Sequence, residues 1–165
     1  MVTHPHPGWQ GATPRCRAAR RVARPRHRGP PGDDPDWPFL LAAGERRSFT
    51  ANTIIRDPAW RKRGAEGALR IHPEDALGLG VGDGGTVRIV TPRGSASSVV
   101  ALDESMSRGH VSLPNGMGTD HLEHDGRRVT TGVAPNELTS AGHRDPWVGT
   151  PWHKTVPARL EAVEP

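Results

Sequence analysis

Four short segments combine polar, uncharged side chains with neighbouring glycine or proline, and they hold the residue types best suited to binding. The segments are 48–53, 114–116, 136–139 and 149–151. Asn and Thr offer neutral hydrogen-bond donors and acceptors, and glycine lets a backbone approach a ligand closely. Arg46, Arg47 and Lys154 add positive charges suited to phosphate. Such a set can hold a large polar ligand without transforming it, but the same residue types also make ordinary turns.

Motifs for catalysis are mostly missing from the sequence. No nucleophile elbow, Walker loop or dinucleotide fingerprint after a strand is present. His121 and His124 stand among three acidic residues without a recognised metal-ligand spacing, and a solvated acidic loop is the interpretation we favour there. The single cysteine, Cys16, excludes an internal disulfide and a Cys-rich metal site. We therefore expect no catalytic and no metal-binding residue.

The elements that must position the polar segments are short. Strands are expected at 38–43, 69–71, 86–90, 96–102, 110–113, 129–134 and 155–160. Residues 73–78 carry a helix-start signature, with proline at the first helical position and two acidic residues in the first turn. With 20 glycines and 17 prolines in 165 residues, a helix bundle is excluded. The pattern favours a mainly β barrel with short helices and long loops.

Charge divides the chain into two regions. Residues 1–32 hold seven arginines and no acid, while residues 33–165 carry 15 basic and 18 acidic residues. We expect 1–36 to be a disordered Arg/Pro-rich tail and 37–165 to be one folded domain. The tail is either a solvated or upstream segment or an arginine-rich arm for nucleic acid or an acidic partner. No apolar run of membrane-spanning or signal-peptide length is seen, so a cytoplasmic location and no membrane partner are expected.

Three groups of residues, in this order, resemble a known family. The first runs from His72-Pro73-Glu74-Asp75-Ala76 through Gly82-Asp83 and Arg93-Gly94 to Gly109-His110-Val111 and Pro114-Asn115-Gly116. The second is Asn136-x-Leu138-Thr139, followed by Asp145-Pro146 and Pro151-x-x-Lys154; the third is the 44–53 loop with Arg56-Asp57-Pro58 behind it. Together they resemble the C-terminal molybdopterin-dinucleotide-binding domain of the molybdopterin oxidoreductases. The overall style is similar to the formate dehydrogenase-like members.

This resemblance implies a fold, a cofactor and a set of binding residues. The implied fold is a six-stranded double-psi β-barrel, and the implied cofactor is molybdopterin guanine dinucleotide carrying molybdenum or tungsten. The domain would form one wall of the cofactor cleft. The implied cofactor-binding residues are Arg46, Arg47, Ser48, Thr50, Asn52, Thr53, Asn115, Gly116, Asn136, Thr139 and Lys154.

The sequence departs from the family where the metal is held. Family members supply the metal ligand and often an iron–sulfur cluster from other domains, which this sequence lacks. The resemblance therefore implies a partner, namely the catalytic oxidoreductase domains or a catalytic subunit, and no activity for the chain alone. Two alternatives stay open: a non-catalytic barrel remnant without ligand, and an interaction module with a basic tail. The acidic excess of 33–165 argues against nucleic acid as a partner of the folded part.

Overall fold

The computed structural model describes residues 34–45, 57–61, 64 and 66–163. Its strands are β1 (Phe39–Glu45), β2 (Leu69–Ile71), β3 (Thr86–Val90), β4 (Ser95–Leu102), β5 (His110–Pro114), β6 (Thr119–Leu122), β7 (Arg128–Thr131) and β8 (Val156–Ala162). Its helices are α1 (Pro73–Gly78) and the short 3-10 turns η2 (Pro58–Trp60) and η3 (Pro135–Glu137).

Six strands close into a barrel in the order β1-β5-β2-β4-β3-β8. The pairs β1–β5 and β2–β4 are parallel, and the remaining four pairs are antiparallel. Because each strand is hydrogen-bonded on both sides, the barrel has no open edge. The closed six-stranded barrel expected from the resemblance is confirmed.

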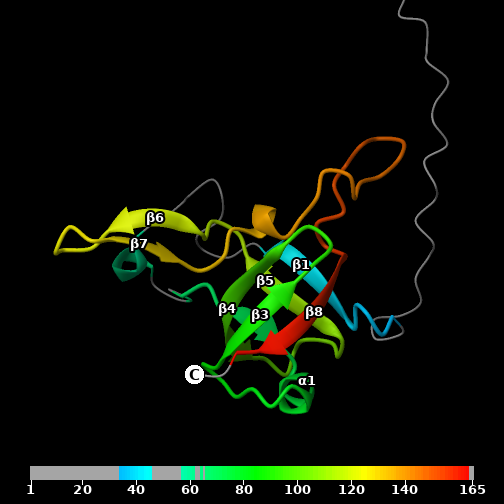
Figure 1. Cartoon of the computed structure of the whole chain (residues 1–165), viewed down its shortest axis with the longest axis horizontal. Coiled ribbons are helices and arrows are strands. Elements are labelled where there is room, and N and C mark those ends of the chain that lie inside the picture. The colour runs from blue at the N-terminus through cyan, green and yellow to red at the C-terminus, as the bar shows by residue number, and fades with distance from the viewer. Residues whose placement is uncertain (1–33, 46–56, 62–63, 65, 164–165) are drawn as a thin grey trace, which may run out of the picture.

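The strand directions divide the connections between the two ends of the barrel. β1, β3 and β5 run one way, and β2, β4 and β8 run the other way. The chain therefore leaves β1, β3 and β5 at the same end, which we call the loop end, and the connections 91–94 and 115–155 start and finish there. The helix α1, the 103–109 turn and the end of β8 lie at the opposite end (Figure 1).

The core is filled from inside the barrel by alternate residues of the strands. Each barrel strand contributes at least one buried aliphatic side chain, and the core includes Leu41, Ile71, Ile89, Val100, Val111, Leu113, Ala158 and Leu160. Val133 and Leu138, from the long 115–155 connection, close the loop end of the same cluster. The β-branched and leucine side chains at alternate positions explain why these short segments form strands.

The expected helix is confirmed and its ends have clear causes. His72 caps it, since Nδ1 accepts a hydrogen bond from the Glu74 N–H at 3.2 Å. Pro73 occupies the first helical position, and Gly80, with φ of +71°, follows its end. Strands expected at 69–71 and 86–90 are found at those residues, and the other barrel strands shift by one or two positions.

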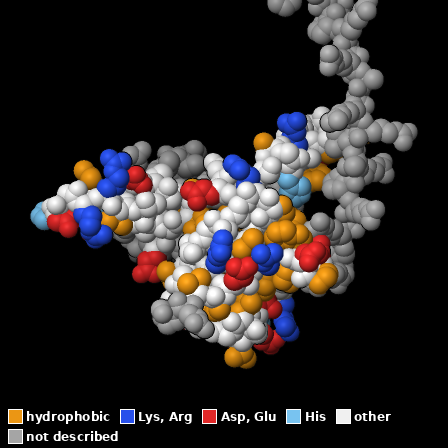
Figure 2. All heavy atoms as spheres, in the orientation of Figure 1, with side chains coloured by type: hydrophobic (Ala, Val, Ile, Leu, Met, Phe, Trp, Pro, Cys, Tyr) orange, Lys and Arg blue, Asp and Glu red, His pale blue; other side chains and the backbone are white. Residues whose placement is uncertain are grey.

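The segment around His121 is a strand, which corrects the sequence interpretation of a solvated loop. β6 pairs with β7 as a separate two-stranded sheet, from Thr119 opposite Thr131 to Leu122 opposite Arg128. The expected strand at 129–134 is correspondingly shorter and lies outside the barrel. The hairpin of β6 and β7 has few apolar residues, and polar contacts join its two strands. Asp120 accepts hydrogen bonds from Thr130 and Arg128. This hairpin arm projects beyond the barrel, with charged side chains along it (Figures 1 and 2).

The arm is fastened at its base by close backbone contacts. Met117 is buried and packs between Gly67 and Gly132. Gly118 has φ of +73°, and a Cβ there would lie 2.2 Å from the Ala134 nitrogen. Only glycine is compatible with this position. Among the helices of the described residues, none is long and apolar enough to span a bilayer.

Candidate binding site at the loop end

The loop end is organised around the last two residues of β1. The register between β1 and β5 shifts after Ala43, which produces a bulge at Gly44. Gly44 has φ of +83°, and a Cβ there would approach the Asn115 side chain to 3.8 Å. The Asn115 N–H donates to the Glu45 carbonyl at 2.9 Å. The bulge thus brings the ends of β1 and β5 into direct contact.

Lys154 reaches the same bulge from the start of β8. Its Nζ donates to the Gly44 carbonyl at 2.7 Å, across 110 positions of the sequence. The neighbouring backbone supports this contact, since the Ala43 N–H donates to the His153 carbonyl at 2.8 Å. An ammonium group has three N–H donors. Among the described residues Lys154 uses one donor, on the Gly44 carbonyl, which leaves two donors and its positive charge for a ligand.

Asn115 and Gly116 form the turn that follows β5. The Gly116 N–H donates to Asn115 Oδ1 at 3.0 Å, and Gly116 has φ of +77°. Asn115 therefore uses its side-chain oxygen within the turn. Its side-chain NH₂ group donates to none of the residues that the structure describes, so two further donors are available to a ligand. The turn-forming and ligand-binding interpretations of this residue are compatible.

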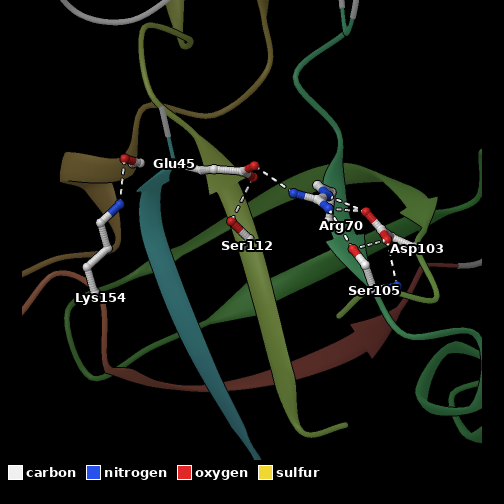
Figure 3. Close-up of polar contacts among 7 residues, drawn as sticks. Glu45, Arg70, Asp103, Ser105, Ser112 and Lys154 are labelled. Carbon is white, nitrogen blue, oxygen red and sulfur yellow. Dashed lines mark hydrogen bonds and ion pairs between the residues drawn. The ribbon is translucent and has the colours of Figure 1, made fainter. Parts of the chain in front are cut away.

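A row of charged and hydroxyl side chains runs from β1 across β5 and β2 to the turn that follows β4 (Figure 3). Glu45 accepts from Arg70 NH1 at 2.6 Å and from Ser112 Oγ at 2.9 Å. Arg70 Nε donates to Asp103 Oδ2 at 2.6 Å, and its NH2 contacts both Asp103 and Ser105. We call Glu45, Ser112, Arg70, Asp103 and Ser105 the polar row.

The electrostatics of the polar row are those of a tightly paired cluster. Hydrogen bonds from Ser105 and then from Arg70 lower the pKa of Asp103 from 3.8 to about 2. Hydrogen bonding to Asp103 raises the pKa of the Arg70 guanidinium despite partial burial. Arg70 and its two carboxylates are each about one-quarter exposed. The ion pair between Arg70 and Asp103 consequently persists across the whole neutral pH range.

The turn η3 brings two further predicted residues to the loop end. η3 packs beside β1, and its Asn136 is exposed to solvent. Thr91, at the end of β3, is buried, and its Oγ1 donates to the Leu138 carbonyl at 3.0 Å. Thr139 follows Leu138 directly and is half-buried. The β3–β4 turn and η3 are thereby joined.

Five of the eleven predicted binding residues can be placed, and all five lie at the loop end. Asn115 and Lys154 lie against Gly44, and Gly116 follows Asn115 in the same turn. Asn136 and Thr139 lie on the adjacent η3 connection. The other six lie outside the described residues: Arg46, Arg47, Ser48, Thr50, Asn52 and Thr53. Roles in cofactor binding for all eleven stay predictions.

The sequence does not show the roles of two residues that matter for the site. It indicates Gly44 as the end of a strand and the first residue of the 44–53 motif, and Arg70 only as part of a short strand. Their importance comes from partners 25 to 110 positions away. His121 lies on β6 and His124 in the following turn, and within the described ranges no group of three or more His, Cys, Asp or Glu side chains could hold a metal ion.

Comparison with known proteins agrees with this barrel fold. Residues 39–157 match the family model of the molydopterin dinucleotide binding domain. The match covers well over half of the chain and includes every barrel strand at least in part. The chain therefore belongs to the molybdopterin-dinucleotide-binding domain family, and the resemblance seen in the sequence is confirmed.

Individual relatives are much larger than this chain. It is 32% identical over 82 residues to a tetrathionate reductase polypeptide from Archaeoglobus fulgidus, a match covering 50% of this chain and 7% of that protein. It is 32% identical over 78 residues to a biotin sulfoxide reductase of Cereibacter sphaeroides, covering 47% of this chain and 10% of that protein. The fold is similar to that of part of acetylene hydratase from Pelobacter acetylenicus, with a TM-score of 0.58 and 18% sequence identity. This likeness covers 78% of this chain and 19% of the acetylene hydratase chain.

The donors present at the loop end suit a molybdopterin dinucleotide. The diphosphate of such a cofactor is anionic and its bases carry hydrogen-bond acceptors, so N–H donors and a positive charge are required. Lys154 supplies the charge with two N–H groups, and Asn115 supplies a neutral NH₂ group. Because Glu45 is paired with Arg70, its negative charge is neutralised close to the bulge. The described residues fit the cofactor class.

Proposed function

We propose that this chain forms one wall of the cleft for molybdopterin guanine dinucleotide in a molybdenum or tungsten oxidoreductase. When bound, that cofactor supplies the redox chemistry at its metal. The observation that carries the proposal is the convergence of Asn115, Gly116 and Lys154 on the Gly44 bulge, at the barrel end where η3 also lies.

In this proposal Lys154 neutralises cofactor phosphate, and Asn115 donates to a polar group of the pterin or the nucleotide. The fixed Gly44 contact limits the rotamers of Lys154 before binding, which reduces the entropy lost on binding. Arg46, Arg47, Ser48, Thr50, Asn52 and Thr53 complete the wall, as the family resemblance implies. The remaining walls and the metal ligand come from catalytic domains or a catalytic subunit.

The need for a partner follows from the size of the chain and the shape of cofactor sites. Cofactor sites are concave and bury most of the ligand surface. The chain spans 7 to 19% of the length of the three relatives compared with it. A single domain of this size supplies one face of such a site. We accordingly propose that the chain has no oxidoreductase activity by itself and that its substrate is selected by the partner.

The experiment is anaerobic isolation of the tagged chain from its own cells, together with the polypeptides that accompany it. Released pterin is oxidised and measured by fluorescence, nucleotide by chromatography, and metal by mass spectrometry. We expect pterin, guanine nucleotide and one of the two metals in near-equal amounts. Asn115→Ala and Lys154→Met should each lower the pterin content several-fold, whereas Arg127→Met on the exposed arm should not. Complexes that contain no pterin, or that hold it unchanged in both variants, contradict the proposal.

A further inference from the structure

We infer that Arg70 is a positioning residue for the turn at Asn115 and Gly116, acting through Glu45. The inference rests on the proposed function only in taking this turn to bind a cofactor; the positioning itself is a property of the described residues. Arg70 makes no hydrogen bond to Asn115 or Lys154 in the structure. It acts on the peptide units that accept hydrogen bonds from these two residues.

The first step is the anchoring of Arg70 on its far side. Asp103 Oδ2 accepts from Nε at 2.6 Å and also from NH2. These two contacts restrict the orientation of the guanidinium group. Ser105 holds the carboxylate in turn, with its N–H at 2.8 Å and its Oγ at 2.5 Å from Asp103 Oδ1. With both oxygens of the carboxylate occupied, Arg70 has a fixed direction along the outside of β2.

The second step is the transfer of that direction to Glu45. Arg70 NH1 binds Glu45 Oε1, and Ser112 Oγ binds Oε2, so both carboxylate oxygens are held (Figure 3). Glu45 is the residue at which the β1 register has just slipped. The bulge at Gly44 interrupts the ladder just before Glu45, and the pairing of β1 with β8 ends at Leu41, so among the described residues Glu45 has a strand partner only on β5. Its side-chain contacts therefore do more to fix its backbone than they would in a regular strand.

The third step joins Glu45 to the binding turn through the backbone. The Glu45 carbonyl accepts from the Asn115 N–H at 2.9 Å, and the preceding Gly44 carbonyl accepts from Lys154 Nζ at 2.7 Å. A shift of the Glu45 backbone thus moves the acceptors of both Asn115 and Lys154. Arg70 controls the spacing of two predicted binding side chains without touching the ligand.

The test measures amide hydrogen exchange by NMR in Arg70→Leu. The Asn115 amide reports directly on its bond to Glu45, and the Val100 amide, which donates to Gly85 at 2.8 Å at the opposite end, reports on the barrel. We expect the Asn115 amide to exchange about tenfold faster and Val100 to change by less than about twofold, because only a local opening is made easier. Arg70→Lys, which retains one contact but cannot bridge two carboxylates, should give an intermediate rate.

The matched control is Arg108→Leu. Arg108 also pairs with two carboxylates, Glu74 and Asp75, but beside α1 at the end away from the binding turn. It should leave the Asn115 amide unchanged. If Arg70→Leu fails to fold, Ser112→Ala removes one contact to Glu45 and should accelerate Asn115 several-fold in the same way.

The outcomes separate the inference from the proposed function. An unchanged Asn115 rate in Arg70→Leu, or equal acceleration of Asn115 and Val100, overturns the positioning role. Acceleration of Asn115 together with several-fold loss of pterin from the isolated complex supports both. Acceleration of Asn115 with full pterin content supports the positioning role and counts against the turn as the cofactor contact.

Discussion

At the scale of single residues, the loop end depends on a few polar contacts between distant parts of the chain. Thr91 is the clearest example, because its hydroxyl serves three backbone groups at once. It donates to the Leu138 carbonyl, and it accepts from the Arg93 and Gly94 N–H groups at 3.2 and 3.3 Å. The residue is 4% exposed, so water cannot replace these bonds.

Replacing Thr91 with valine should therefore destabilise the protein. The change keeps the shape but leaves a buried carbonyl without its donor, which costs about 1–3 kcal/mol in the free energy of unfolding. Urea denaturation measures the difference. Thr86→Val, at an exposed position on the same strand, is the control and should lie within about 0.5 kcal/mol of wild type. Equal effects of the two substitutions would contradict the role given to the hydroxyl.

The low pKa of Asp103 makes its contribution to stability dependent on pH. The pKa in the folded protein, about 2, lies below the ordinary value of 3.8, so folding favours the ionised form. The contribution is fully present above about pH 5 and is lost as the pH falls toward 2. Denaturation of wild type and Asp103→Asn between pH 2 and 7 should show a gap that is constant above about pH 5 and closes below about pH 4. A gap that widens in acid would show that the sign is wrong.

At the scale of elements, the hairpin arm β6–β7 shows how glycine makes a tertiary contact possible. The arm joins the barrel where Gly118 meets the backbone of Ala134. At its tip, Gly126 also has a positive φ, of +81°, but a Cβ there would meet nothing within 4 Å. The two glycines share a conformation and differ in their surroundings.

This pair separates backbone strain from steric contact. Gly126→Ala should lower the free energy of unfolding by about 1 kcal/mol, the cost of a left-handed alanine. Gly118→Ala adds an impossible contact at 2.2 Å, so its cost should exceed that of Gly126→Ala by about 2 kcal/mol or more. Thermal or urea denaturation of both variants gives the comparison. Similar costs would mean that the arm can move away from Ala134 easily.

At the scale of the whole molecule, the closed barrel should unfold as one cooperative unit. Its core is a single cluster to which all six barrel strands contribute, including Leu41 on β1 and Ile89 on β3. Burial on opposite sides of one cluster couples strands that are far apart in sequence.

Leu41→Ala and Ile89→Ala should each cost about 2–5 kcal/mol, the usual range for a fully buried aliphatic side chain. Circular dichroism and tryptophan fluorescence should give the same midpoint in each variant. Leu77→Ala, at a position 80% exposed on α1, should change stability by less than about 0.5 kcal/mol. Separate transitions for the two signals would show that part of the barrel unfolds independently.

The sequence by itself determined the elements whose cause is local. Alternating aliphatic residues specified β3 and β2, and proline with two acidic residues specified α1, because period and capping act within a few positions. The ordered family motifs identified the barrel and the class of cofactor. They also predicted the turn containing Asn115 and the side chain of Lys154 as cofactor contacts, since both lie in motifs with fixed spacing.

Only the tertiary structure decided which of these residues meet. The bulge at Gly44, the bond from Lys154 and the route from Asp103 through Arg70 to Glu45 join positions up to 110 residues apart. The pairing of β6 with β7 was not predicted from the sequence, because its cross-strand contacts are polar and the two strands show little alternation of apolar and polar residues. Barrel closure fixes these neighbours through strand order and register, which no local pattern of residues encodes.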